Sequence, residues 1–203
     1  MVKTDEKLME NFLAGDEKSL ELLIDRYLKP LYGFVLQLVG DGNVAQDIVQ
    51  EVFVKAWKHA NSFNMDKKFS TWLYAIAKNT AYDFLKKKKT IPFSAFENSN
   101  GQNMLEFIED QTALHSSTLL QKMDDTKEAQ EYLQSLKPEL RTILVLHHKQ
   151  GFSLVEIAEI MKSPANTVKS KYRRAIFFLK KIKLSTSSSV ASKNVAPETN
   201  PAS

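Results

Sequence analysis

The sequence predicts an all-α protein of two small helical domains joined by a flexible linker, and the C-terminal domain contains a helix-turn-helix. Three observations lead to this fold class. Apolar residues recur at helical spacing over most of the chain, without a convincing run of the alternating pattern that is typical of strands. The stretch from Thr90 to Leu120 interrupts this periodicity with Pro92, Gly101 and several Asn and Ser. Residues 151–181 then carry the start and stop signals of two consecutive helices.

The same reasoning divides the chain into four parts. We expect a helical domain over residues 5–90, a flexible acidic linker over 91–124 and a second helical domain over 125–184. The last part, 185–203, is rich in Ser, Asn and Pro and is expected to be disordered. Aromatic residues at helical spacing, Trp57 among them, are expected to pack inside the two domains.

Composition excludes several classes of function. The 203 residues are 43% hydrophobic and 26% charged, as in ordinary folded proteins. There is no Cys, and the 4 His do not have the spacing of a metal site. No phosphate-binding loop or nucleophile constellation is visible, so we expect no catalytic residues, metal or cofactor. Because no apolar run reaches the roughly 20 residues of a membrane span, we expect a cytoplasmic protein that inserts into no membrane.

Charge is distributed unevenly along the chain, whose net charge is +4. Residues 90–126 contain 1 basic and 6 acidic side chains, whereas 127–184 contain 12 basic and 5 acidic ones. A basic block behind an acidic spacer is typical of a domain that binds a polyanion. The same count would also fit a solvated helical surface, and charge alone does not decide between the two.

The helix-turn-helix is predicted from capping signals. Gly151 suits the left-handed end of the helix before it, and Ser153 with Glu156 forms a capping box that starts a helix at Leu154. Pro164 marks the first position of a second helix. Two helices joined by about three residues are a helix-turn-helix candidate.

The second of these helices has two distinct faces. Val168, Tyr172, Ala175 and Leu179 recur at the spacing of an inward-facing stripe. Polar and basic residues occupy the opposite face and its flanks: Asn166, Thr167, Lys169, Ser170, Lys171, Arg173 and Arg174. A generic solvated face is the alternative interpretation. We favour DNA binding, because these side chains offer donors for base edges and positive charge for phosphates.

The segment from Leu136 to Ala175, LKPELRTILVLHHKQGFSLVEIAEIMKSPANTVKSKYRRA, resembles region 4 of bacterial extracytoplasmic-function (ECF) sigma factors. The resemblance implies that this domain binds the −35 promoter element. Two residues depart from the family pattern, since Lys162 and Asn166 stand where Gly is common. A left-handed backbone at Lys162 would carry a modest strain, and Asn166 adds a side chain beside the DNA.

Residues 43–58, NVAQDIVQEVFVKAWK, form an amphipathic helix that Asn43 can cap. Its predicted buried stripe consists of Ala45, Ile48, Val49, Val52 and Ala56. Asp47, Gln50 and Glu51 share the other side. Spacing alone favours a plain solvated face over a surface for a basic protein partner.

This helix resembles the core-binding helix of region 2 in ECF sigma factors. The resemblance implies that it docks on the clamp coiled coil of the largest RNA polymerase subunit. The residues carried over as polymerase-binding candidates are Asp47, Gln50, Glu51 and Phe53.

The next segment, residues 68–89, reads KFSTWLYAIAKNTAYDFLKKKK and also matches region 2. Ser70 can cap it, and periodicity places Lys78, Asn79 and Lys86 on its exposed side. The resemblance implies that this helix and the preceding loop, 61–68, read the single-stranded −10 element and capture a flipped base. The candidates for this contact are Phe63, Asn64, Lys78, Asn79, Asp83 and Lys86. Asp83 could instead stabilise the fold through a salt bridge.

The three motifs stand in the order of the ECF family and predict an alternative sigma factor without covalent chemistry of its own. The implied partners are promoter DNA and core RNA polymerase, through the clamp coiled coil of its largest subunit and the subunit near −35. An anti-sigma factor is a further partner of many family members. The alternative is a stand-alone helix-turn-helix regulator, which would form a homodimer on a palindromic site.

Overall fold

The computed structural model describes residues 3–88 and 127–193, with side chains described for 3–88 and 130–181. Every regular element within these ranges is helical, which confirms the predicted all-α class. The elements are α1 (Asp5–Leu13), α2 (Glu17–Val39), α3 (Gly42–Lys58), a 3-10 turn (Ala60–Ser62), α4 (Phe69–Lys88), α7 (Lys127–Ser135), α8 (Pro138–His148), α9 (Leu154–Met161) and α10 (Ala165–Lys193).

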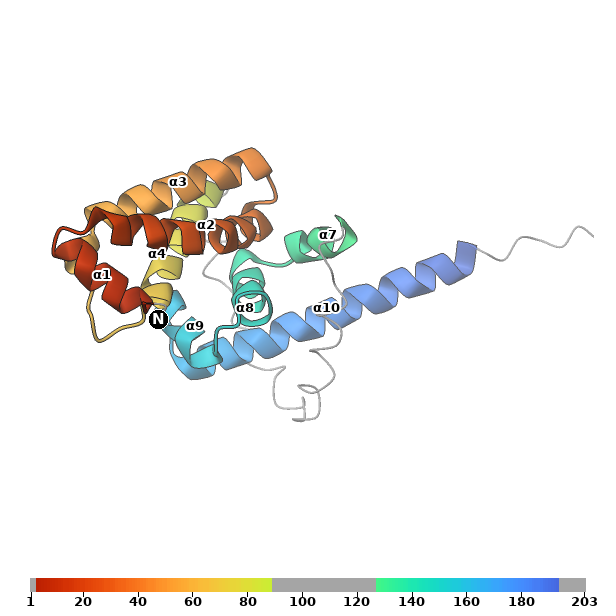
Figure 1. Cartoon of the computed structure of the whole chain (residues 1–203). Helices are drawn as coiled ribbons and strands as arrows, with labels where there is room; N and C mark the ends of the chain where they lie inside the picture. The colour runs from red at the N-terminus through yellow and green to blue at the C-terminus, as the bar shows by residue number, and fades with distance from the viewer. Residues whose placement is uncertain (1–2, 89–126, 194–203) are drawn as a thin grey trace, which may run out of the picture.

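Helices α1 to α4 form the first body, in which α2 contacts each of the other three (Figure 1). The buried side of α2 includes Leu31, Phe34, Val35 and Leu38, whose side chains are fully excluded from solvent. Gly40 ends the helix with φ 76°, a left-handed conformation that glycine adopts without steric cost. This core holds α3 and α4 in place and so positions both predicted region 2 surfaces.

Helices α7 to α10 form the second body, and α8 lies at its centre. Every residue from Leu140 to Leu146 is buried, because α8 is covered by α10, α9 and α7 and, from the other body, by α2. A helix that is apolar nearly all round needs such cover on several sides.

The two bodies pack against each other along α4 and α2. Helix α9 lies on α4, and α8 and α7 lie on α2 (Figure 1). The rings of Tyr74 in α4 and Phe152, just before α9, meet edge to face with centroids 4.9 Å apart. The Tyr74 hydroxyl also donates a hydrogen bond of 2.6 Å to Gln150 Oε1. The apolar core therefore continues from one body into the other.

A buried guanidinium joins the two bodies at one end of this interface. Arg141 in α8 is 5% exposed and donates to the carbonyl oxygens of Leu38, Leu133, Gln134 and Leu136. These carbonyls belong to the ends of α2 and α7 and to the residue after α7, where a helix leaves its last carbonyls without partners of its own. Burial lowers the pKa of Arg141 to about 10, so the group remains charged at neutral pH.

One predicted boundary lies outside the described residues, and another differs from the structure. The linker prediction, 91–124, lies within residues 89–126 and therefore outside the described residues. The tail was expected to begin at 185, but α10 continues to Lys193. Ser dominates residues 185–193, and this segment contains neither Pro nor Gly that would stop the helix. The remaining residues, 194–203, are not described.

Among the described helices, none combines the length and the apolarity that a bilayer crossing requires.

Replacing Arg141 should be costly. The Arg141→Ala variant leaves four buried carbonyls without their donor, so we expect the free energy of unfolding to fall by about 2–5 kcal/mol. Arg26→Ala is the matched control, because Arg26 is a more exposed arginine that pairs with Asp5 and should contribute at most about 1 kcal/mol. Urea denaturation measures both values, and equal losses would contradict the role given to Arg141.

Candidate nucleic-acid and protein interfaces

Helix α3 presents the predicted polymerase-binding face. Its five predicted stripe residues are all buried, as expected. The predicted cap is wrong, because Asp41 rather than Asn43 caps the helix. The Asp41 carboxylate accepts hydrogen bonds from the backbone N–H groups of Asn43 at 3.0 Å and Val44 at 3.1 Å. A carboxylate at this end also interacts favourably with the helix dipole.

Asp47, Gln50 and Glu51 are all exposed on one side of α3. Val54 and Trp57 continue the same side and are 47% and 58% exposed. The expectation that Trp57 packs inside the domain is therefore wrong. An exposed tryptophan and valine beside two carboxylates form an amphipathic surface of the kind found in protein interfaces.

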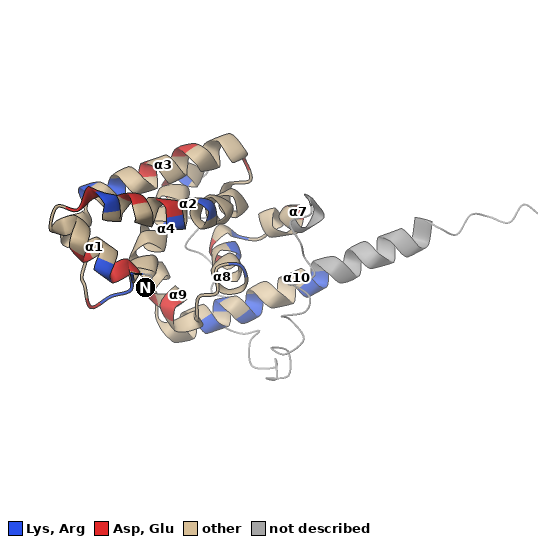
Figure 2. Cartoon of the chain, viewed as in Figure 1, with Lys and Arg blue, Asp and Glu red and all other residues tan. Residues whose placement is uncertain are grey.

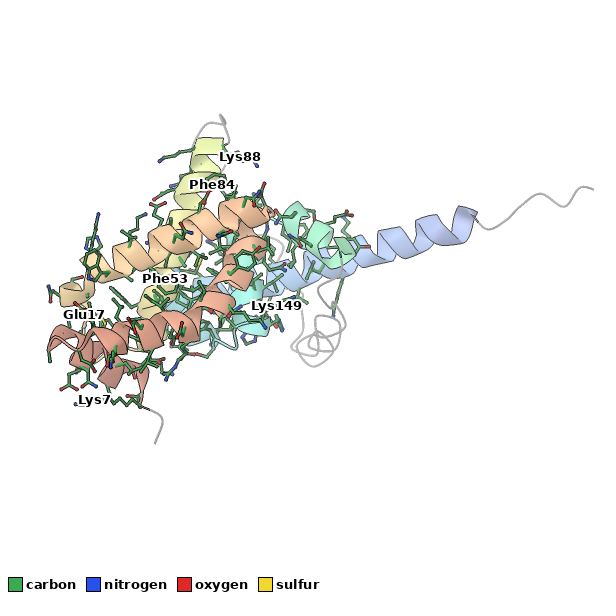
Figure 3. All side chains as sticks on the ribbon, turned by 45° about the horizontal axis from the view of Figure 1, so that its top comes forward. Lys7, Glu17, Phe53, Phe84, Lys88 and Lys149 are labelled. Atoms are coloured by element: carbon green, nitrogen blue, oxygen red, sulfur yellow. The ribbon has the colours of Figure 1, made fainter. Side chains whose placement is uncertain are left out.

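Phe53 lies at the edge of that surface, three residues from Gln50 and four from Trp57. It is half-buried and packs against the core of the first body, because it lies on a different side of α3 from Asp47. Figure 3 shows its place on the helix. Of the four predicted polymerase-binding residues, Phe53 is thus the one that is partly buried, at the edge of the exposed face.

The loop before α4 is held by backbone contacts. Asn64 Oδ1 accepts a hydrogen bond of 2.8 Å from the Asp66 N–H, and the Asn64 carbonyl accepts one of 3.0 Å from Lys67. The first N–H of α4, that of Phe69, donates to Glu6 Oε1 at 3.1 Å, so Glu6 of α1 takes the role that the sequence assigned to Ser70. Asn64, as predicted, remains exposed.

Phe63 is buried rather than available to DNA. It is 6% exposed, and its ring centroid lies 5.9 Å from that of Phe69 and 5.3 Å from that of Trp72. Sequence alone could not distinguish a stacking platform from a core aromatic at this position. In this structure the Phe63 ring packs against Phe69 and Trp72 and so anchors the loop to the core.

Lys78 is also buried, which contradicts its predicted place on the exposed side of α4. It is 7% exposed and shares a face with Tyr74 and Tyr82, which contact the second body. Burial and the nearby positive charge of Lys162 lower the pKa of Lys78. Periodicity within one helix cannot reveal that a distant part of the chain covers this face.

The other predicted −10 residues of α4 lie on an uncovered face. Asn79, Asp83 and Lys86 follow each other at helical spacing and are exposed. The helix then projects beyond α3, with Phe84 and Lys88 near its free end (Figure 3). The exposed face and the lysine-rich end together offer hydrogen-bonding groups and positive charge.

The helix-turn-helix has the predicted local geometry. The Ser153 N–H donates to Glu156 Oε2 at 2.9 Å and the Glu156 N–H to Ser153 Oγ at 3.3 Å, which confirms the capping box. Gly151 has φ 76°, and Lys162 forms the turn with φ 50° and ψ 47°. Both residues are left-handed, as expected, and α10 begins at Ala165 directly after Pro164.

Helix α10 separates its two predicted faces. Val168, Ala175 and Leu179 are buried, and Tyr172 is half-buried with its hydroxyl 3.0 Å from His148 Nε2. On the other side Asn166, Lys169 and Arg173 are exposed, whereas Thr167, Ser170, Lys171 and Arg174 are half-buried. Figure 2 shows the basic residues along this helix. Lys171 is partly engaged, because it pairs with Glu139 of α8.

Two ion pairs connect the bodies, and the sequence alone could not have predicted them. Lys68 Nζ lies 2.6 Å from Glu156 Oε1, and Lys67 Nζ lies 3.6 Å from Glu159 Oε2. The hydrogen bonds from Lys68 and Ser153 lower the pKa of Glu156 to about 2. About ninety residues separate the partners, and no local pattern connects them. These pairs join the predicted −10 loop to the first helix of the helix-turn-helix.

Comparison with known proteins identifies both bodies. The family described as Sigma-70 region 2 matches residues 23–91, and the family described as Sigma-70, region 4 matches residues 126–176. The chain is 36% identical over 179 residues to the ECF RNA polymerase sigma-E factor of Escherichia coli, covering 85% of this chain and 90% of that protein. It is 34% identical over 174 residues to the RNA polymerase sigma-H factor of Pseudomonas aeruginosa, covering 84% and 89%.

Solved structures show the same fold. A co-crystal structure of the sigma factor RpoE with the anti-sigma factor NepR from Bartonella quintana matches with a TM-score of 0.60 and 25% identity, covering 81% of this chain and 96% of that one. The structure of CnrH in complex with the cytosolic domain of CnrY matches with a TM-score of 0.66 and 20% identity, covering 90% and 99%.

The left-handed turn at Lys162 gives a first prediction for this site. Lys162→Gly removes the Cβ that is strained at φ 50°, whereas Lys162→Ala removes the same charge and keeps the Cβ. We expect the glycine variant to be more stable than the alanine variant by about 1 kcal/mol. Thermal unfolding of the two variants measures the difference, and an alanine variant of equal or higher stability would contradict the assigned strain.

The low pKa of Glu156 gives a second prediction. Since its folded value, about 2, lies below the ordinary value of 4.5, its stabilising effect is complete above pH 4.5 and is lost as the pH falls toward 2. The free energy of unfolding should therefore decline less steeply over this acid range in Glu156→Gln than in the native chain. Glu21→Gln, at an exposed position of α2, should keep the native slope. Urea denaturation at several pH values tests this, and parallel native and Glu156→Gln curves would refute it.

Proposed function

This chain belongs to the ECF family of RNA polymerase sigma factors, and we propose that it binds core RNA polymerase and directs promoter recognition, DNA melting and transcription initiation. The observation that carries this proposal is the presence of both sigma regions in one chain. A stand-alone regulator would need the helix-turn-helix but not the exposed acidic face of α3.

The polymerase contact is assigned to α3. Asp47, Gln50 and Glu51 offer carboxylates and an amide to a basic partner surface, while Val54 and Trp57 add apolar area. By similarity to the family, this partner is the clamp coiled coil of the largest subunit. Lys55 lies 2.7 Å from Glu51, so Glu51 must exchange this pairing when it binds. Asp47 and Gln50 are therefore the clearest residues to test.

Promoter contacts are assigned to α10 and α4. The N-terminal part of α10, from Asn166 to Arg174, would enter the major groove of the −35 element. Exposed Asn64, Asn79 and Asp83 would read the melted −10 strand, and Lys86 would contact its phosphates. Binding the unpaired strand offsets part of the free energy that unstacking and unpairing consume.

The remaining assignments follow from membership of the family. The chain contributes binding rather than covalent chemistry, and it works in the cytoplasm together with the polymerase. The polymerase subunit near −35 is a second contact, made by the second body. An anti-sigma factor is a candidate regulator, since the similar Bartonella quintana sigma factor was solved in complex with one.

Transcription in vitro tests this proposal. Purified core RNA polymerase with the chain should produce specific transcripts from genomic promoter fragments that are absent without it. Asp47→Ala and Gln50→Ala should each reduce these transcripts about tenfold or more, because each removes a contact near the centre of the polymerase-binding face. Asp25→Ala changes an exposed carboxylate of α2 and should have little effect.

Binding measurements separate the alternative function. A chain that fails to bind core polymerase, yet binds a palindromic duplex tightly as a homodimer, would be a stand-alone regulator. That result would overturn the sigma assignment for this chain.

A further inference from the structure

Lys171 belongs to the predicted −35 set, but the geometry of α10 places it beside the buried stripe of that helix. An α-helix turns by about 100° per residue, so residues three and four apart share a face. Lys171 follows the buried Val168 by three positions and precedes the buried Ala175 by four. Lys169 and Arg173 are exposed on the other side of the helix. Lys171 therefore flanks the core of the second body and lies away from the exposed face of α10.

The contact that Lys171 makes there is an ion pair with α8. Its Nζ lies 2.5 Å from Oε2 of Glu139, and the two side chains are 26% and 35% exposed. Glu139 lies in the first turn of α8. Salt and water screen a partly buried pair less than a fully exposed one. The pair therefore holds the Lys171 side chain against the start of α8.

The next residue of α10 makes a second polar contact with α8, at the opposite end. The Tyr172 hydroxyl lies 3.0 Å from His148 Nε2, and the two rings stack with centroids 5.7 Å apart. Burial and the neighbouring His147 lower the pKa of His148 to about 4, so this imidazole is neutral at neutral pH. Glu139 and His148 are nine residues apart, which is about 14 Å along the helix axis. Lys171 and Tyr172, although adjacent, therefore reach opposite ends of α8.

We propose that Glu139 and His148 are positioning residues that fix the orientation of α10 on α8, and that Lys171 serves this arrangement instead of contacting the −35 element. This inference rests on the proposed function. The two contacts Lys171–Glu139 and Tyr172–His148 together form the clamp.

Two separated polar contacts fix an angle that apolar packing leaves free. The core side of α10 here consists of Val168 and Ala175, and hydrophobic and dispersion attractions between such side chains are not directional. Hydrogen bonds require particular distances and angles. Because the N-terminal part of the recognition helix enters the major groove, a small rotation of α10 changes which base edges its side chains reach. The clamp therefore determines base preference as well as stability.

The clamp also gives the lysines of α10 different roles. The charge of Lys171 is matched by the Glu139 carboxylate, so it displaces no counterion from the DNA. Lys169 is exposed on the other side of the helix, where a phosphate can approach it. These two lysines, two positions apart, are a matched pair for comparing positioning with direct contact.

The test uses the full chain bound to core RNA polymerase and one of the genomic promoters that it transcribes, with the −35 element randomised. Lys171→Met removes the charge and keeps most of the length of the side chain, and Glu139→Ala removes its partner. Lys169→Met is the control for the lysine, and Glu131→Ala, at an exposed position of α7, is the control for the carboxylate. Sequencing of the bound DNA gives the base preference, and binding at several salt concentrations gives the salt slope.

We expect Lys171→Met and Glu139→Ala to change the same −35 base preferences and to weaken binding about three- to tenfold, as a partly misplaced set of base contacts implies. The salt slope of Lys171→Met should equal that of the native chain. Lys169→Met should keep the base preference and reduce the slope by about 0.9, the value of one phosphate contact. Glu131→Ala should change neither. A loss of folded protein alone lowers the amount of active chain and alters neither readout.

The double variant Glu139→Ala with Lys171→Met shows whether the two residues act as a unit. It should bind no more weakly than the weaker single variant, because both changes break the same contact. A reduction of the slope in Lys171→Met as large as that in Lys169→Met would show a phosphate contact and overturn the proposal. Native base preferences in Glu139→Ala would overturn it as well.

The other end of the clamp is tested by Tyr172→Phe, which removes the hydroxyl and keeps the stacked ring. We expect a change in −35 base preferences with an unchanged salt slope, because no charge is lost. Native preferences in this variant would overturn the role of His148.

A failure of the proposed function would look different. If the native chain supports no transcription with core polymerase, the sigma assignment fails, and the same variants are compared by selecting duplexes from a random-sequence pool with the chain alone. If the native complex transcribes and the variants keep its base preferences, the clamp alone is overturned.

Discussion

The arrangement of this chain depends on one buried cation, the guanidinium of Arg141. Helices α2 and α7 both end where α8 begins to pack, and each leaves carbonyl groups that face the interior. Arg141 donates to these carbonyls from the centre of the second body. Without such a donor, two helix ends could not be buried here, and α8 would lose the cover of α2.

The interface that results stabilises the packing of the two bodies and determines which predicted −10 residues are exposed. It continues the apolar core through Tyr74 and Phe152, but it also covers Lys78 and engages Lys67 and Lys68. Lys78 is therefore buried, whereas Lys67 and Lys68 are exposed and paired with glutamates. Asn79, Asp83 and Lys86 remain outside. The interface thus buries one predicted −10 residue of α4 and leaves three others exposed.

Sequence reasoning predicted what short-range patterns determine. Helical periodicity gave the all-α class and the α3 stripe, and the capping signals at Ser153 and Glu156 placed the start of α9. Sequence reasoning failed where contacts between residues far apart in the sequence determine the structure. Glu6 caps α4 from another helix, Phe63 turns inward to Phe69 and Trp72, and Lys78 is covered by the second body. The pairing of Lys68 with Glu156 likewise follows from the packing of two bodies, and a single helix contains no information about it.

The contacts between the two bodies differ in kind from one end of the interface to the other. Of the acceptors around Arg141, only the Leu38 carbonyl belongs to the first body; Leu133, Gln134 and Leu136 lie in the second. Separation therefore removes one acceptor and leaves the buried guanidinium largely satisfied, so no isolated charge is created. The lysine–glutamate pairs at the other end are open to solvent, so they contribute little to the interface. The bodies are held together mainly by the ring pair of Tyr74 and Phe152, by the hydrogen bonds of Tyr74 with Gln150 and of Tyr82 with Thr142, and by the packing of α8 and α7 on α2.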